Sequence, residues 1–423
     1  MRGRTEGQRP GRRRICAAGG RQGQRFRILL PALCAAMMFA GCGAEGSGVS
    51  APQENAAAGA GITDGAGAAD SAEAVDSPET LDGGGQEEAG EEDLHPYDFT
   101  LAFAGDINLA DDWNTMEYYR QQEDGIRGCI DPELIGRMQA ADLTCVNVEF
   151  CLSDKGSPMD GKLYTFRADP SHVSILQELG VDLANLANNH AYDYGEEAFV
   201  DMLSILRENG IAYVGAGADS QEAQSPYYAD IDGRTVAVVS ATRAEKYILT
   251  PEAGEDTPGV FRCYDTQRLL EQVREADANA DFVVAYIHWG TECSETLEDA
   301  QTTGAKELVQ AGADVVLGAH PHCLQGMDYV DGVPVLYSLG NYWFNEKTLD
   351  TVLAELRFYG DDESSCVEVG LIPAVQEDHY TRRLTQEDEI GRWSAHMEHM
   401  SSDRVKITWT DGKGIIGEAS DGD

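Results

Sequence analysis

Short apolar runs alternate with amphipathic segments between residues 98 and 345, and this alternation restricts the possible fold more than any other feature. The runs are four to seven residues long, which suits buried strands better than helices. Strands that alternate with helices favour an α/β fold containing a parallel sheet. The predicted strands are Phe99–Ala104, Leu143–Val148, Val181–Ala187, Thr235–Ala241, Asp281–Ile287, Asp314–Leu317 and Val333–Tyr337.

Three of the segments between these runs have helical periodicity. In Glu196–Asn209 the apolar residues recur at helical spacing, and Gly210 follows as a C-terminal cap. Thr266–Ala276 and Ala300–Ala311 repeat the pattern. We therefore expect these three segments to be helices that cover a sheet.

The C-terminal part of the chain has a different pattern. Thr351–Phe358 and Val367–Pro373 alternate apolar and polar residues, as in an antiparallel hairpin. Asp388–Met400 is expected to form a closing helix. We predict that residues 351–423 complete the domain formed by residues 96–350.

Polar residues follow the predicted strands at the points where the strands end. In open α/β sheets, ligands bind at the carboxyl ends of the strands. Four of the nine histidines in the chain lie at these ends, so the clustering is selective. The candidate site residues are Asp106, Glu149, Asn189, His190, His288, His320, His322 and Asn341.

Carboxylate, amide and imidazole groups at one sheet edge suit divalent first-row ions such as Mn, Fe or Zn. Two such ions about 3.5–4 Å apart can clamp a phosphoryl group and generate a hydroxide nucleophile. Each motif also has an ordinary explanation, since Gly-Asp after a strand is a common turn and Asn-x-Glu a common cap. Their occurrence together favours a site for one or two divalent metal ions.

The charge of the chain excludes one class of partner. Lys and Arg number 31 against 74 Asp and Glu, which gives a formal net charge of −43. Nucleic-acid binding depends on cationic side chains that neutralise phosphates, so we expect no nucleic-acid partner.

A multi-span membrane protein is also excluded, because only one apolar run approaches the necessary length.

The N-terminus is typical of an export signal. Nine arginines and the apolar segment Ile28–Phe39 precede Ala40-Gly41-Cys42. This order resembles a bacterial lipobox, which predicts a lipoprotein signal peptide at 1–41 and lipidation at Cys42. The protein would then be exported and anchored to the cell membrane by its lipid. The alternative is an ordinary signal peptide with an incidental cysteine.

Residues 42–95 are predicted to be a disordered acidic tether. Residues 43–95 contain 13 acidic residues, no basic residue and almost no large apolar side chain. Such a segment cannot bury enough surface to offset its ordering entropy. The alternative is a segment that folds only on a partner.

The ordered motifs from Gly105-Asp106 to Gly340-Asn341 resemble the capsule-synthesis CapA family, which is associated with poly-γ-glutamate synthesis and export. They include Asn147-Val148-Glu149, Asn188-Asn189-His190, His288-Trp289-Gly290 and His320-Pro321-His322. This family belongs to the calcineurin-like metallophosphoesterase superfamily. The resemblance implies a four-layer α-β-β-α sandwich, with the C-terminal segment as a small antiparallel extension.

The resemblance also implies a role for each matched residue. Asn189 is a metal ligand and His190 an acid acting on the transition state, with Asp106 as a further catalytic residue. Asn108 stands where the superfamily has a histidine ligand, and Ala191 stands where an acidic residue usually follows the catalytic histidine. The implied ligands are Asp106, Glu149 and His322 for one ion, and Glu149, Asn189, His288 and His320 for the other.

Three residues are candidates for substrate binding. Arg167 could hold an anionic group or form a structural ion pair. Trp289 could line a groove or pack in the core. Asn341, at the end of the last matched motif, is the third candidate.

Two classes of function are compatible with the sequence. One is a cell-surface, metal-dependent hydrolase of a phosphoester or a γ-glutamyl amide. The other is a non-catalytic accessory subunit of a polyglutamate synthesis complex with a structural or vestigial metal site. An anionic polymer would be repelled by most of the acidic surface, which favours local contact at a metal.

Overall fold

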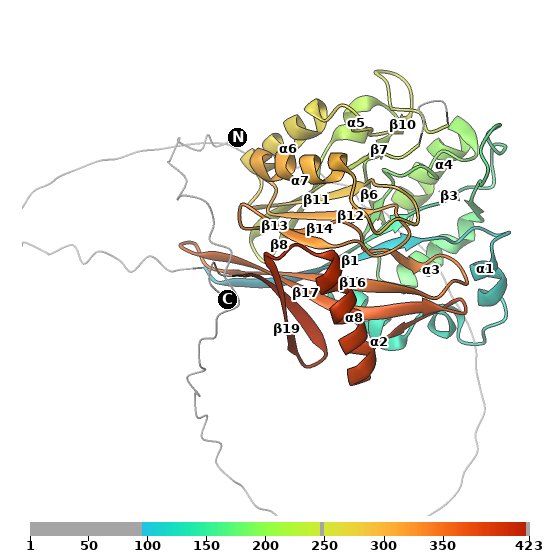
Figure 1. Ribbon diagram of the computed structural model, residues 1–423. Helices are drawn as coiled ribbons and strands as arrows, with labels where there is room; N and C mark the ends of the chain where they lie inside the picture. Colours follow the sequence, from blue (N-terminus) through green and yellow to red (C-terminus); the bar gives the residue numbers. More distant parts are fainter. Residues whose placement is uncertain (1–94, 246–248, 420–423) are drawn as a thin grey trace, which may run out of the picture. The chain divides into compact units, whose positions relative to one another are not determined.

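The computed structural model describes residues 95–245 and 249–419, and the structural statements below refer to these residues (Figure 1). The predicted signal peptide, Cys42 and the tether lie outside them. Two large β-sheets form the centre of the described part, one with ten strands and one with six.

The ten-stranded sheet has the order β19-β20-β17-β16-β1-β2-β5-β6, with β15 paired to β1 and β18 to β17. The pairs β1–β2, β2–β5 and β5–β6 are parallel, so these strands end at one edge. The strands are β1 (Tyr97–Ile107), β2 (Leu143–Val148), β5 (Leu183–Asn185), β6 (Ala212–Val214), β15 (Asn341–Trp343), β16 (Leu349–Gly360), β17 (Ser365–Glu377), β18 (Tyr380–Arg383), β19 (Val405–Thr410) and β20 (Lys413–Glu418).

The six-stranded sheet has the order β13-β14-β12-β11-β9-β8. Its inner strands β14, β12, β11 and β9 pair in parallel and also end at one edge. Its strands are β8 (Tyr227–Ile231), β9 (Arg234–Thr242), β11 (Phe282–His288), β12 (Val315–Ala319), β13 (Met327–Val330) and β14 (Val333–Leu336).

The helices and two short strand pairs complete the described elements. The short pairs are β3 (Cys151–Leu152) with β4 (Arg167–Ala168), and β7 (Ala216–Gly217) with β10 (Gly259–Val260). The α-helices are α1 (Asn114–Tyr119), α2 (Pro132–Ala140), α3 (Val173–Glu178), α4 (Gly195–Glu208), α5 (Ser220–Gln224), α6 (Gln267–Asn279), α7 (Asp299–Ala311) and α8 (Glu387–Met400), and two 3-10 turns span Gly125–Gly128 and Pro170–His172.

The two sheets pack face to face on one apolar core. Side chains of β1, including Phe103, join those of β9 and β11 in a single buried cluster. The rings of Phe103 and Tyr286 lie edge to face with their centroids 5.7 Å apart. The Tyr286 hydroxyl donates to the Ala104 carbonyl oxygen at 2.8 Å, which ties the two sheets together directly.

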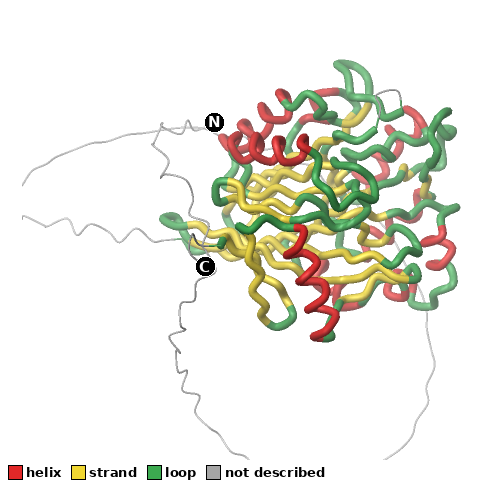
Figure 2. The backbone as a smooth tube through the Cα atoms, viewed as in Figure 1, coloured by secondary structure: helices red, strands yellow, loops and turns green. Residues whose placement is uncertain are grey.

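Helices cover the outer faces of both sheets. Apolar residues of α2, α3 and α4 pack on the ten-stranded sheet, and those of α6 and α7 pack on the six-stranded sheet. Figure 2 shows α6 and α7 as red segments beside the yellow strands they cover. The strands buried between two such layers are almost continuously apolar, which explains why their sequences read as runs rather than alternations.

The α/β fold predicted from the sequence is confirmed. The predicted strand at 143–148 coincides with β2, and the other predicted strands and helices recur as β1, β5, β9, β11, β12, β14, α4, α6 and α7 with slightly different ends. The predicted hairpin is β16–β17, and β16 pairs with β1 from Tyr97↔Gly360 to Ala104↔Leu353. The C-terminal hairpin is therefore an inner part of the larger sheet and not an extension outside it.

The helices differ from membrane-spanning segments in length and composition. Within residues 95–245 and 249–419, none is both long enough and apolar enough to cross a bilayer.

Candidate metal centre

The predicted site residues come from the carboxyl ends of strands in both sheets. β1 carries Asp106, and Glu149 follows β2 directly. Asn189 and His190 lie in the turn after β5. From the other sheet, His288 ends β11, and His320 and His322 follow β12. Because the two sheets face each other with these ends together, the side chains meet at one edge of the sandwich.

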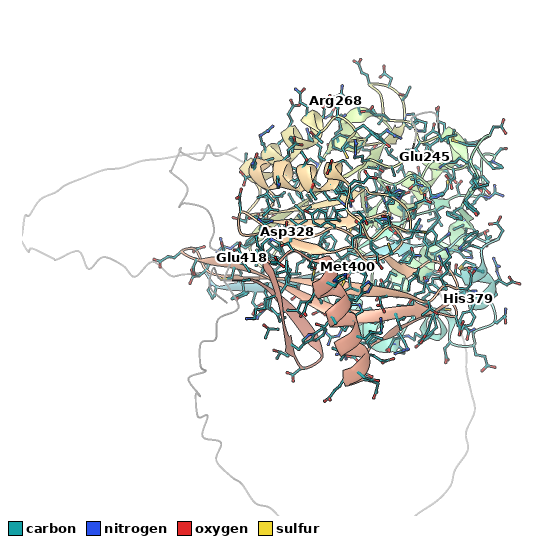
Figure 3. The ribbon with its side chains drawn as sticks, viewed as in Figure 1. Glu245, Arg268, Asp328, His379, Met400 and Glu418 are labelled. Carbon is teal, nitrogen blue, oxygen red and sulfur yellow. The ribbon has the colours of Figure 1, made fainter. Side chains whose placement is uncertain are left out.

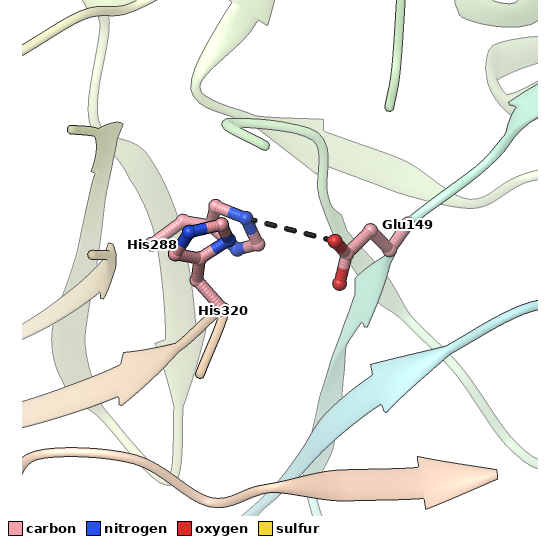
Figure 4. Close-up of side chains that lie close together, drawn as sticks. All are labelled: Glu149, His288 and His320. Carbon is pink, nitrogen blue, oxygen red and sulfur yellow. Dashed lines mark ion pairs between the residues drawn. The ribbon is translucent and has the colours of Figure 1, made fainter. Parts of the chain in front are cut away.

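The structure brings these side chains into two adjacent groups that share Glu149. One group is Glu149, His288 and His320, and the other is Asp106, Glu149 and His322. Within each group one potential ligand atom from every residue lies within 4.8 Å of the others. Figure 4 shows the first group, with the His288 ring facing the Glu149 carboxylate. These are the residue sets that the family resemblance implies for two ions, apart from Asn189.

The Glu149 Oε1 atom lies at the centre of the histidines. It is 4.0 Å from His190 Nε2, 3.8 Å from His288 Nε2 and 3.7 Å from His322 Nε2. None of these separations is a hydrogen bond, and the oxygen is buried without a hydrogen-bond partner. The carboxylate oxygen is therefore surrounded by nitrogen ligands at distances that leave room for a cation between them.

Three buried atoms of the two ligand groups have no hydrogen-bond partner: Asp106 Oδ2, Glu149 Oε1 and His320 Nδ1. An unpaired buried polar atom costs about 1–3 kcal/mol, so native structures rarely leave several together. All three can offer a lone pair, and Asp106 Oδ2 makes no hydrogen bond although His322 Nδ1 lies 3.2 Å away. This donor set fits divalent first-row ions.

Burial and mutual charge set the protonation of the centre. Burial, with repulsion from His320 and His322, holds the pKa of His288 well below its usual value. Burial and His322 lower the pKa of His320 to about 3. At neutral pH both imidazoles are uncharged, so their nitrogen lone pairs are free for a cation.

Two other groups of the centre have raised pKa values, whereas those of His288 and His320 are lowered. Burial and the nearby Asp106 raise the pKa of Glu149 well above its usual value. At His322 burial lowers the pKa, but attraction from the nearby Asp106 carboxylate outweighs it and the net change is upward. Ionising Glu149 beside Asp106 is therefore costly without a cation, and a divalent ion between the two carboxylates would offset that cost.

Asn147 is a member of the centre that the sequence interpretation missed. Its Nδ2 donates to Asp106 Oδ1 at 2.7 Å and Glu149 Oε2 at 3.2 Å, and lies 3.3 Å from His288 Nδ1. Asn185 Nδ2 donates to its Oδ1 at 3.0 Å, which fixes the amide orientation. The available signal was its position two residues before Glu149, because alternate residues of a strand share a face.

The partner of His190 was also missed. The resemblance compares Ala191 with an acidic residue, but the structure places the carboxylate of Asp193 at 2.7 Å from His190 Nδ1. Asp193 is fully buried, and its Oδ2 also accepts from the Phe166 amide at 2.7 Å. A carboxylate that contacts one ring nitrogen fixes the imidazole and leaves the other nitrogen facing the centre.

Asn189 lies at the edge of the group that includes His288. Its Oδ1 is 2.7 Å from His288 Nε2, which brings the amide oxygen to the nitrogen that faces Glu149. Asn108, which the resemblance compares with a superfamily histidine, accepts from the Ala110 amide through Oδ1, and its Nδ2 is buried without a partner. Among the described residues, the group around Asp106 therefore has three charged or imidazole ligands and no fourth.

The loop after β12 is held in an uncommon backbone conformation. His320 has φ 98° and His322 has φ 59°, whereas residues with side chains rarely adopt positive φ. Such conformations cost about 1–3 kcal/mol and cluster at functional sites. The strain turns two histidines separated by one proline toward the centre.

The three candidates for substrate binding occupy different environments. Asn341 is buried, and its Oδ1 lies 2.9 Å from His322 Nδ1, so it orients that imidazole. Trp289 is 3% exposed and its indole donates to the Tyr337 carbonyl, which matches the core-packing alternative. The Arg167 guanidinium lies 4.4 Å above the Tyr194 ring, and Arg167 is not a member of either metal-binding group.

Comparison with known families gives the relationship of the chain. A model described as "Bacterial capsule synthesis protein PGA_cap" matches residues 100–346, more than half of the chain. The chain belongs to this family. The matched range contains every residue of the centre, from Asp106 to Asn341, and the resemblance seen in the sequence is confirmed.

Two relatives of this chain come from Bacillus species. The chain is 35% identical over 191 residues to "Capsule biosynthesis protein CapA" of Bacillus anthracis, covering 43% of the chain and 46% of that protein. It is 29% identical over 263 residues to "PGA biosynthesis protein CapA" of Bacillus subtilis, covering 60% and 67%. The chain thus spans about half the length of the first relative and two thirds of the second.

Two solved structures have distant similarity to the chain. A putative 5'-nucleotidase from Staphylococcus aureus, determined with α-ketoglutarate, has 12% identity and a TM-score of 0.41, covering 71% of this chain and 58% of that one. A hypothetical protein from Thermus thermophilus has 16% identity and a TM-score of 0.40, covering 66% and 99%.

Proposed function

We propose that the protein is an exported, membrane-anchored hydrolase that uses one or two divalent ions and serves capsule or poly-γ-glutamate synthesis. The observation that carries the proposal is the Glu149 carboxylate oxygen, shared by two ligand groups and ringed by three imidazole nitrogens at 3.7–4.0 Å. The substrate would be a phosphoester or a γ-glutamyl amide, because both are attacked by a metal-activated water.

Each of the two groups would hold one ion. Asp106, Glu149 and His322 would hold one ion, and Glu149, Asn189, His288 and His320 the other. When bound, such ions polarise the scissile group and lower the pKa of a water molecule. Asn147 supports both groups, since its amide contacts Asp106, Glu149 and His288 together.

His190 is suited to protonate the leaving group. Its Nδ1 is taken by Asp193, while its Nε2 lies 4.0 Å from Glu149 Oε1 and so faces the centre. General acids held in this way contribute about 10²–10⁴-fold to rate. Asp193 keeps the imidazole oriented before any substrate binds.

Access by an acidic polymer would be local. The net charge of −43 repels polyglutamate over most of the protein surface. We therefore propose that a chain end or a single linkage approaches the bound ions, with no extended binding along the polymer. The family relationship to the Bacillus capsule proteins supports this substrate class.

The hydrolase proposal is tested with the full-length protein purified in detergent. After chelation and reloading with Mn²⁺, turnover is measured on bis(4-nitrophenyl) phosphate and on γ-glutamyl-4-nitroanilide. We expect one of the two to be hydrolysed and H190A to lower kcat by about 10²–10⁴-fold. H396A is the matched control, because His396 pairs with Glu295 at 3.2 Å outside the centre. No turnover of either substrate with Mn²⁺, Fe²⁺ or Zn²⁺ would contradict the proposal.

The anchor is a separate proposal. The Ala40-Gly41-Cys42 order supports lipidation at Cys42 and retention at the membrane. C42S should release the protein from the membrane fraction or block its processing. Unchanged partitioning of C42S into detergent would refute the lipid anchor and leave the hydrolase proposal standing.

A second candidate function rests on Asn108. Because this residue stands where the resemblance places a superfamily histidine, the group around Asp106 lacks a usual ligand, which favours an accessory subunit with a structural metal site. In that case metal binding would stabilise the protein without turnover, and N108H would raise metal occupancy. Co-purification with a polyglutamate synthesis complex would identify the role.

A further inference from the structure

The loop between β3 and β4, residues 153–166, contains a buried ammonium group. The Lys162 side chain is 1% exposed, whereas the adjacent Leu163 and Tyr164 are 86% and 56% exposed. Burying an ammonium ion costs several kcal/mol unless charged and hydrogen-bonded partners compensate it. The position of Lys162 must therefore be stabilised by its contacts.

Those contacts are two carboxylates and a backbone carbonyl. Lys162 Nζ pairs with Asp193 Oδ1, lies 3.0 Å from Glu245 Oε2, and donates to the Asn189 carbonyl oxygen. Thr250 Oγ1 lies 3.0 Å from the same carbonyl and 2.8 Å from Glu245 Oε2. Glu245 is labelled in Figure 3, so the location of this cluster relative to the sheets can be followed there.

This cluster adjoins the metal centre at two points. Both carboxylate oxygens of Asp193 have partners: Oδ1 pairs with Lys162, and Oδ2 contacts His190 Nδ1 and accepts from the Phe166 amide. Asn189 has its carbonyl held by Lys162 and its side-chain oxygen 2.7 Å from His288 Nε2. One ammonium group is thus bonded to the partner of His190 and to the backbone of the neighbouring residue.

We propose that Lys162 is a positioning residue for the reaction, which holds Asp193 and the Asn189 backbone so that His190 faces the scissile bond. This inference rests on the proposed hydrolase function, with His190 as the acid. Lys162 does not touch the reacting atoms and acts through Asp193. The loop that bears it also places Phe166, whose ring centroid is 4.4 Å from that of His190.

The same loop supplies a matched control. Lys155 pairs with Asp201, but its side chain is 48% exposed. K162M and K155M therefore make the same chemical change in one loop, at a buried and an exposed position. An exposed pair contributes about 0–1 kcal/mol, so K155M should change little.

The kinetic test uses Mn²⁺-loaded full-length protein and a series of phosphodiesters or anilides whose leaving groups range from good to poor. K162M should lower kcat by about 10- to 100-fold with a smaller change in KM, and the loss should grow as the leaving group becomes poorer. This dependence arises because a misplaced acid matters most when the leaving group needs a proton. In an H190A background, K162M should have no further effect.

A merely structural role would give different results. If K162M lowered kcat equally for good and poor leaving groups, or acted in full on H190A, the positioning role would be refuted. A kcat for K162M equal to that of K155M would refute it as well. If K162M does not fold, the double variant K162M/E245Q, which also removes an uncompensated carboxylate, replaces it in the same comparisons.

A second measurement separates this inference from the proposed function. Hydrogen exchange at the Phe166 amide reports its bond to Asp193 Oδ2, and we expect at least tenfold faster exchange in K162M than in K155M. If the wild-type protein shows no turnover, the proposed function fails and exchange alone decides whether Lys162 holds Asp193. Equal exchange in the two variants would overturn the proposal.

Discussion

Metal binding should stabilise this protein, and His320 should be necessary for most of the effect. An ion that binds only the folded state at one hundred times its dissociation constant adds about 2.7 kcal/mol. The described part has roughly 320 residues, and unfolding entropy is about 2.1 cal/mol/K per residue, so this corresponds to about 4 °C in Tm.

The structure explains why H320A should remove this gain. His320 belongs to the Glu149 and His288 group, and its Nδ1 is buried without a hydrogen-bond partner. Without metal, replacing His320 by Ala loses packing but also removes an unsatisfied polar atom, and these effects oppose each other. The metal-free Tm of H320A should therefore stay close to that of the wild type, while the metal-dependent shift falls to the contribution of the other group.

The assay is calorimetry of chelated full-length protein at pH 7.5, titrated with Mn²⁺ and followed by metal analysis. H396A is the control, since it removes an imidazole that is 34% exposed and lies outside the two groups. H396A should keep the full shift. The reasoning would be refuted if added metal left the Tm of the wild type unchanged, or if H320A retained the whole shift.

Two further predictions concern pH and the backbone beside the centre. In the metal-free protein the pKa values of His288 and His320 are lowered, so below pH ~6.5 only the unfolded state binds their two protons, which favours unfolding. The raised pKa of Glu149 means that the folded state binds one proton that the unfolded state lacks, which offsets one of those two. Stability should be greatest near pH ~6.5, because at higher pH the folded state loses the protons that the raised pKa values of Glu149 and His322 let it keep. Below pH ~6.5 stability should fall by about 1.4 kcal/mol per pH unit toward pH ~4.5, and urea unfolding of H320Q should show almost no slope in that range. G105A should lower the free energy of unfolding in urea by about 3 kcal/mol or more, because its Cβ would lie 1.9 Å from a backbone carbonyl oxygen. G136A on α2, where the added Cβ has open space around it, should be neutral or stabilising. Equal effects of the two substitutions would contradict this explanation.

Much of the site could be read from the sequence because its geometry follows from strand direction. The parallel strands β1, β2 and β5 end at one edge, so residues after them had to meet there. The same reasoning holds for His288 and His320 at the ends of β11 and β12. The apolar runs and capping glycines that predicted these elements are local signals, so they can be recognised in the sequence without knowledge of the fold.

Residues that act through another side chain were not visible in this way. Asp193 reaches His190 from three positions later in an irregular turn, where no periodicity relates sequence spacing to direction. Lys162 looks like an ordinary loop lysine, and its burial arises from contacts with Asp193 and Glu245, which are 31 and 83 residues away in the chain (193 − 162; 245 − 162). Satisfying a buried charge is a long-range requirement that only the folded chain reveals.

The sequence by itself determined the α/β class, the order of the strands along the chain and the residues that lie at their ends. The tertiary structure decided how those ends face one another across two sheets, that β16 inserts beside β1, and that Trp289 packs in the core. The physical reason is that local patterning specifies which side chains avoid water, whereas the pairing of buried polar and charged groups depends on which segments meet in space.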